Sequence, residues 1–66
     1  MAIHKVIEVL SQSKKSWEDA AQQAVTDASK SVKNIRAVDL EHLEAVVKNN
    51  KIVQYRINAK ITFELG

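Results

Sequence analysis

The sequence predicts an α+β fold in the order strand, helix, strand, strand. Three observations support it: an alternating β-branched segment at the start, a stripe of small apolar residues at helical spacing, and a long alternating segment at the end. The chain has 66 residues, so residues 1–66 are expected to form a single domain. The two long strands are expected to pair as an antiparallel hairpin whose apolar face packs on the helix.

The first strand is predicted over residues 3–10. Apolar side chains occur in both phases of its alternation, with Ile3, Ile7 and Val9 in one phase and Val6 and Leu10 in the other. This pattern is typical of a strand covered on two sides. The polar run Ser11-Gln12-Ser13 is expected to end the strand.

The helix is predicted at about residues 14–33. Its apolar stripe consists mainly of alanine, which would let the helix lie close to whatever it covers: Trp17, Ala20, Ala21, Ala24, Val25, Ala28 and Val32. Ser13 is the preferred N-cap, because its hydroxyl can accept a hydrogen bond from a free backbone N–H of the first turn. Ser16, with Asp19 three residues later, is the alternative.

The second half of the chain predicts two long strands joined by a tight turn. Residues 35–47 alternate, but their phase changes near Glu41–His42, which predicts a bulge. Residues 48–51 read as a turn, because asparagine tolerates the left-handed conformation of tight hairpins. Residues 52–65 alternate without a break, so one face is apolar and the other polar. This polar face is expected to meet solvent or another subunit.

Length and composition predict an oligomer. A domain of this size buries only ~60% of the surface of its unfolded chain, and such domains usually need disulfides, a metal or partner chains. The sequence has no cysteine, which excludes a disulfide framework and thiolate metal sites. His4 and His42 alone are too few for a structural zinc site. Self-association is the remaining source of stability, and the open sheet edges favour it.

Several function classes have little support. The only glycine is Gly66, so no glycine-rich phosphate loop exists, and no nucleophile, base and acid show a catalytic spacing. We therefore expect a non-enzyme. A net charge of +2 is too small to imply nucleic acid. No apolar run reaches the ~20 residues that span a bilayer, and no signal peptide is evident. A cytoplasmic location without membrane contact is expected.

Four segments resemble the dodecin family, and together with the element order they extend over nearly the whole chain. They are Lys5-Val6-Ile7-Glu8, Ser16-Trp17-Glu18-Asp19-Ala20-Ala21, Ser31-Val32-Lys33-Asn34-Ile35-Arg36, and Tyr55-Arg56-Ile57 with Ile61-Thr62-Phe63-Glu64-Leu65. The resemblance implies a three-stranded antiparallel sheet packed on one helix, assembled as a homo-dodecameric shell. It also implies a ligand store or buffer that binds flavins such as riboflavin or FMN in pairs on symmetry axes, without catalysis.

Two positions depart from the flavin-binding pattern that the resemblance implies. Ala37 occupies the position matched to the tryptophan that stacks on the flavin, and Arg56 the position matched to the glutamine at the ring edge. Alanine has no aromatic face, and the loss of one stacking partner costs on the order of 1–3 kcal/mol. Arg56 has donors only, and two copies near a symmetry axis would favour an anionic ligand. Arg36 is a further candidate to contact a phosphate group.

The lack of the tryptophan resembles a dodecin subgroup for which calcium has been proposed as a ligand. Asp39, Glu41 and Glu44 are candidate carboxylates, provided that symmetry brings copies together, because calcium needs several oxygen ligands. His42 shares a strand face with Glu44, but a solvated or interfacial role is the preferred interpretation of both. Three hypotheses follow: a ligand store with an altered flavin-type site, a flavin-binding dodecin proper, or a structural or ion-binding oligomer with no organic ligand.

Overall fold

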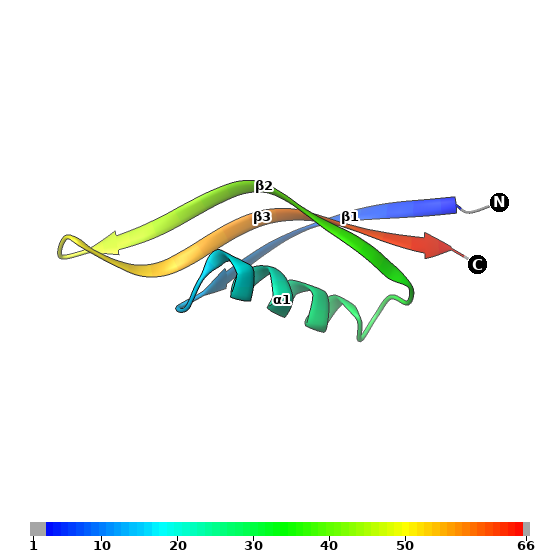
Figure 1. Ribbon diagram of the computed structural model, residues 1–66, viewed down its shortest axis with the longest axis horizontal. Coiled ribbons are helices and arrows are strands. Elements are labelled where there is room, and N and C mark those ends of the chain that lie inside the picture. The colour runs from blue at the N-terminus through cyan, green and yellow to red at the C-terminus, as the bar shows by residue number, and fades with distance from the viewer. Residues whose placement is uncertain (1–2, 66) are drawn as a thin grey trace.

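The computed structural model describes residues 3–65 and contains one three-stranded sheet and one helix. The elements are β1 (Ile3–Ser13), α1 (Trp17–Ala28), β2 (Ile35–Lys48) and β3 (Lys51–Leu65). β3 lies in the centre of the sheet and pairs antiparallel with both β1 and β2. Figure 1 shows α1 lying along one face of this sheet. The predicted α+β class and element order are confirmed.

The helix is shorter than the predicted 14–33, and its N-cap is Ser16. The Ser16 backbone is extended, and its Oγ accepts a 2.9 Å hydrogen bond from the Asp19 N–H. The prediction of Ser13 as the N-cap was wrong, because β1 continues through Ser11-Gln12-Ser13, where Ser13 pairs with Tyr55. At the other end, Asn34 adopts a left-handed φ of 63° that turns the chain into β2.

Ser13 joins β1 to the first turn of the helix. Its buried hydroxyl donates to Asp19 Oδ2 over 2.6 Å and accepts from the Lys15 N–H over 2.9 Å. Gln23 Nε2 donates to the same Asp19 oxygen over 2.6 Å. These hydrogen bonds, first from Ser13 and then from Gln23, lower the pKa of Asp19 below its ordinary value of 3.8 because they favour the charged carboxylate.

The core lies between α1 and β3. The alanine stripe brings the helix close to the sheet, so that Ala20 and Ala21 are buried against Ile57 and Ala59. Trp17 fixes the beginning of the helix, because its Nε1 donates to the Glu44 carbonyl over 3.0 Å and its ring meets Tyr55 edge-on at 4.9 Å. The predicted apolar phase of the last strand therefore forms the core, with Ile61 and Phe63 also buried.

The β2–β3 hairpin extends past the helix as an arm, which we define as residues 46–53 (Figure 1). Asn49 and Asn50 at its tip have left-handed φ angles of 52° and 65°, which confirms the predicted asparagine turn. The predicted bulge is also confirmed, because the β2–β3 register shifts between Leu40 and His42. The molecule measures 51 × 20 × 13 Å, so much of the sheet lies beyond the reach of the helix.

The lowered pKa of Asp19 predicts an acid-sensitive component of stability. A carboxylate with a depressed folded-state pKa stabilises the fold above its unfolded pKa, and this contribution is lost as the pH falls through the folded value. We expect Asp19→Asn to lose less stability than the wild type between about pH 6 and about pH 3, as measured by urea unfolding. Asp27→Asn, at an exposed position of the same helix, is the control. Identical pH dependence of Asp19→Asn and the wild type would contradict the prediction.

Candidate functional site

The sheet face opposite α1 has no layer over it among residues 3–65. Along β3 it carries Gln54, Arg56, Asn58, Lys60, Thr62 and Glu64, and the strand register places side chains of β1 and β2 on either side of most of them. We call this surface the open face. Its polar character along β3 and its lack of a covering layer agree with the prediction made from the alternation of residues 52–65.

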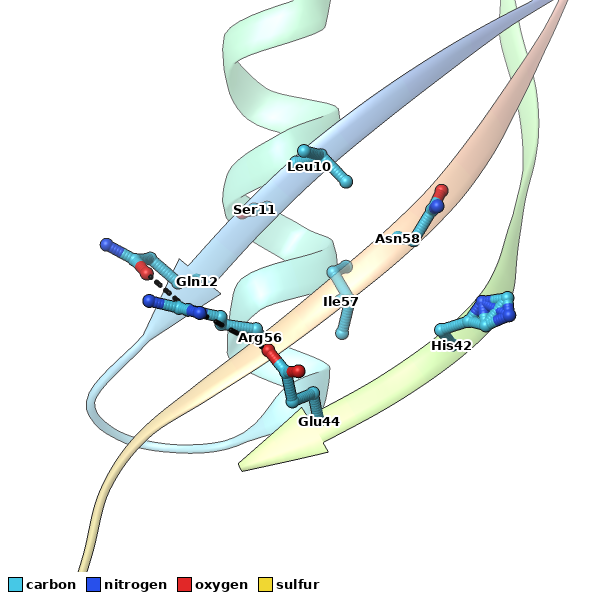
Figure 2. Close-up of a pocket in the computed structure, with 8 residues that line it drawn as sticks. All are labelled: Leu10, Ser11, Gln12, His42, Glu44, Arg56, Ile57 and Asn58. Atoms are coloured by element: carbon cyan, nitrogen blue, oxygen red, sulfur yellow. Dashed lines mark hydrogen bonds and ion pairs between the residues drawn. The ribbon is translucent and has the colours of Figure 1, made fainter. Parts of the chain in front are cut away.

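A shallow groove of about 640 Å³ lies on the open face between β1 and β2. Figure 2 shows its lining residues, which come from all three strands. They are Leu10, Ser11, Gln12, His42, Glu44, Arg56, Ile57 and Asn58. β3 runs along the floor of the groove. We call a residue of β3 together with its partners on β1 and β2 a row, and we name the row by its β3 residue. Two successive rows define the groove: the Arg56 row and the Asn58 row.

Arg56 is held between the two edge strands. Its Nε donates to Gln12 Oε1 over 3.3 Å, and its Nη1 lies 3.3 Å from Glu44 Oε1 (Figure 2). About half of the arginine side chain and more of the glutamate remain exposed, so water screens this pair and its contribution to stability is small. Glu44 balances the arginine charge, so an anionic ligand at Arg56 would have to compete with that carboxylate.

Asn58 provides an unused acceptor on the groove floor. Its Oδ1 is buried and has no hydrogen-bond partner among residues 3–65. The residues opposite it are Leu10 on β1, 81% exposed, and His42 on β2. A buried acceptor without a partner costs about 1–3 kcal/mol. A ligand or neighbouring chain that supplied an N–H or O–H donor there would therefore gain affinity.

The other predicted cofactor contacts lie away from the groove. Ala37 pairs with Thr62, six residues along β3 from Arg56, which corresponds to roughly 20 Å of strand. Arg36 lies at a second register shift, where its Nε is 3.7 Å from Glu64 Oε1; His4 Nε2 is also 3.7 Å from that oxygen. One chain therefore brings neither Ala37 nor Arg36 together with Arg56, and their roles as cofactor contacts stay predictions.

The candidate metal ligands belong to two different rows. Glu41 Oε1 lies 3.0 Å from Lys60 Nζ, and Lys60 also pairs across the sheet with Glu8 and Asp39. Its hydrogen bond to Glu41 and the charges of Glu41, Glu8 and Asp39 raise the pKa of Lys60 above 10.5. Glu44 contacts Arg56 instead. Within residues 3–65, no three histidines, cysteines or carboxylates are grouped so that they could hold a metal ion.

The sequence pattern does not indicate several of the groove residues. It predicts that Gln12 helps to end the first strand, and it points to no site role for Leu10 or Asn58. The available signal was the alternation of β1, which places Leu10 and Gln12 in the same phase. Their partners become known only from the pairing of β1 with β3, between residues more than forty positions apart.

Comparison with known proteins identifies the family. The model of the dodecin family matches residues 3–66. The chain belongs to the dodecin family. It is also 34% identical over 65 residues to the calcium dodecin of Mycobacterium tuberculosis (strain ATCC 25618 / H37Rv), a match that covers 98% of this chain and 92% of that protein. The predicted resemblance is thus confirmed.

Solved dodecin structures share the fold. The crystal structure of the calcium-chelating calcium dodecin from Mycobacterium tuberculosis matches with a TM-score of 0.81 at 33% identity, over 97% of this chain and 91% of that one. The dodecin of Streptomyces coelicolor matches with a TM-score of 0.90 at 20% identity, over 98% and 93% of the two chains. Dodecamer assembly is known for this fold. The 12-residue helix α1 is too short to cross a membrane.

The contacts of Lys60 with acidic residues predict that the stability of the fold depends on the charge of Lys60. In Lys60→Met, the carboxylates of Glu8 on β1 and of Asp39 and Glu41 on β2 would flank β3 without the cation between them, so they would repel one another. We expect a lower thermal midpoint than the wild type at neutral pH, and a smaller difference near pH ~4, where the carboxylates begin to take up protons. Lys5→Met, which removes a β1 lysine from outside the open face, is the control. Equal effects of the two substitutions at neutral pH would contradict this account.

Proposed function

We propose that this dodecin is a small-ligand binding and storage protein that acts as a hollow homo-dodecamer and not as an enzyme. The observation that carries the proposal is the groove of about 640 Å³ on the open face. The groove contains the exposed apolar side chain of Leu10 and the guanidinium of Arg56, which is hydrogen-bonded to Gln12. It also contains the buried Oδ1 of Asn58, which has no hydrogen-bond partner among residues 3–65. Pockets that bind small molecules typically combine apolar surface with a few placed polar groups.

The groove supports an altered flavin-type site. A flavin ring edge offers both hydrogen-bond donors and acceptors, whereas the Arg56 guanidinium offers donors only and is already engaged by Gln12 and Glu44. The apolar side chain at the rim is aliphatic Leu10, and Ala37 adds no aromatic surface. We therefore expect a flavin ring to stack less strongly here, and its edge to be hydrogen-bonded less well, than in a site that has tryptophan and glutamine at these two positions.

Riboflavin titration tests this proposal. We expect quenching of flavin fluorescence only at micromolar or higher riboflavin, and we expect Arg56→Gln to bind more tightly because glutamine restores an acceptor and removes the bond to Glu44. Lys33→Gln, a matched loss of charge outside the groove, is the control. If the wild-type protein instead bound riboflavin at nanomolar concentration, the alternative would hold, namely that this is a dodecin with an intact flavin site.

Calcium is the second candidate ligand. One observation favours it: the relative that is 34% identical is named calcium dodecin. The carboxylates that such a site could use lie on the open face, where Glu41 contacts Lys60 and Glu8 and Asp39 pair with Lys60 across the sheet. Calcium takes 6–8 oxygen ligands, more than these side chains offer in one chain. A calcium site would therefore need carboxylates from sister chains, or displacement of Lys60 from Glu41.

Calorimetric titration with Ca²⁺ and with Mg²⁺ tests the second candidate. We expect Glu41→Gln to weaken Ca²⁺ binding at least tenfold, because it removes a charged ligand, whereas Asp27→Asn on the exposed helix surface leaves binding unchanged. Glu41→Gln binding as tightly as the wild type would contradict a site in the Lys60 row. A wild-type protein that binds neither flavin nor Ca²⁺ would leave the structural oligomer as the better description.

A further inference from the structure

Each arginine and lysine that residues 3–65 place on the open face has a carboxylate partner. The nitrogen–oxygen distances are 3.3 Å, 3.0 Å and 3.7 Å for Arg56 with Glu44, Lys60 with Glu41, and Arg36 with Glu64. Glu8 and Asp39 add two further carboxylates beside Lys60. Leaving aside the imidazoles of His4 and His42, five carboxylates stand against three cations, so an anion that approaches this face meets more negative than positive charge.

The guanidinium of Arg56 is engaged on both of the edges with which it could bind an anion. A guanidinium binds a phosphate or carboxylate through two parallel N–H groups, either Nε with Nη2 or Nη1 with Nη2. Gln12 Oε1 accepts from Nε, and Glu44 Oε1 lies 3.3 Å from Nη1, so each pair includes a nitrogen that already has an acceptor (Figure 2). Because Glu44 is the charged acceptor, an anion at Arg56 would have to displace a carboxylate or lie beside it.

The next row of the groove favours a ligand that has hydrogen-bond donors. Asn58 Oδ1 is buried and has no hydrogen-bond partner among residues 3–65, and the exposed side chain of Leu10 lies opposite Asn58 on β1. An anionic group brings acceptors only, so it would leave this oxygen unpaired, whereas an uncharged amide, imide or hydroxyl group offers an N–H or O–H. The Arg56 row and the Asn58 row therefore discriminate in the same direction.

We propose that the groove binds uncharged ligands in preference to anionic ones, and that Glu44 is the residue that determines this selectivity. The inference rests on the proposed function and names the class of ligand: an uncharged ring compound with both donors and acceptors, and not its phosphorylated form. Arg56 considered without its partners suggests the opposite preference. Its ion pair with Glu44 reverses that preference, because the carboxylate neutralises the guanidinium and repels a second anion.

Riboflavin and FMN are a matched pair of probes, because they share one ring system and FMN adds a phosphate of about −1.5 to −2 charge at pH 7. In low salt we expect the wild-type protein to bind riboflavin at least ~5-fold more tightly than FMN, as measured by quenching of flavin fluorescence. Glu44→Gln keeps the shape of the side chain and removes its charge. We expect it to tighten FMN binding and reduce that ratio at least ~3-fold, with riboflavin affinity changed less than ~2-fold.

Glu18→Gln is the control for the loss of one carboxylate. Glu18 lies in the first turn of α1, on the other side of the sheet from the groove (Figure 1). We expect this variant to keep the wild-type ratio of FMN to riboflavin affinity. The Glu44–Arg56 pair is largely exposed and contributes little to stability, so both variants should fold as the wild type does.

Salt gives a second readout that needs no variant. If repulsion by the open face limits FMN binding, raising NaCl from about 50 mM to about 500 mM screens the repulsion and tightens FMN binding to the wild-type protein. A phosphate held by Arg56 predicts the opposite sign, because salt weakens an attraction between opposite charges. Riboflavin has no net charge, so its affinity should change little with salt.

The outcomes separate this inference from the proposed function. Wild-type protein that binds FMN as tightly as riboflavin, or whose FMN affinity falls with salt, would overturn the inference and leave ligand binding in the groove standing. An unchanged affinity ratio in Glu44→Gln would overturn the role of Glu44 in the same way. Wild-type protein that quenches neither flavin even at millimolar concentration would overturn the proposed flavin-type groove, and the inference with it.

Discussion

The structure depends on one constraint: a short helix covers only part of a long sheet. A 12-residue helix is about 18 Å long, whereas β3 has 15 residues and would extend about 50 Å. The alanine stripe brings the helix close enough to bury Ile57, Ala59 and Ile61, but it cannot cover the arm or the open face. Residues 3–65 therefore form a small core, and large exposed apolar side chains such as Leu10, Leu43 and Val47 remain outside it.

On the open face, the cations and their hydrogen-bond partners come from different strands. The central strand provides the cations Arg56 and Lys60, and the edge strands provide the acids and amides that hold them. Two charged rows result, separated by the row of Leu10, Asn58 and His42. Because the ion pairs of Arg56 and Lys60 lie in the rows on either side, an apolar or hydrogen-bonding ligand can bind at the middle row without first separating an ion pair.

The sequence predicted what depends on local pattern and missed what depends on distant pairing. The unbroken alternation of residues 52–65 predicted the core face, the asparagine pair predicted the turn, and the phase change predicted the bulge at Glu41. The N-cap was misplaced because Ser13 and Ser16 are both suitable hydroxyl residues, and only the pairing of Ser13 with Tyr55 decides between them. Arg56 was singled out by resemblance, but its partners Gln12 and Glu44 come from two other strands.

On the proposed function, assembly must precede ligand binding. A ring-shaped ligand resting on Leu10 in a shallow groove is covered on one side only, and a calcium ion in the Lys60 row finds fewer carboxylates than it needs. Both ligands would obtain their missing contacts from a second copy. A ligand that binds only the assembled form also stabilises that form by mass action. Ligand affinity and subunit association would then depend on each other, so a diluted chain would lose both together.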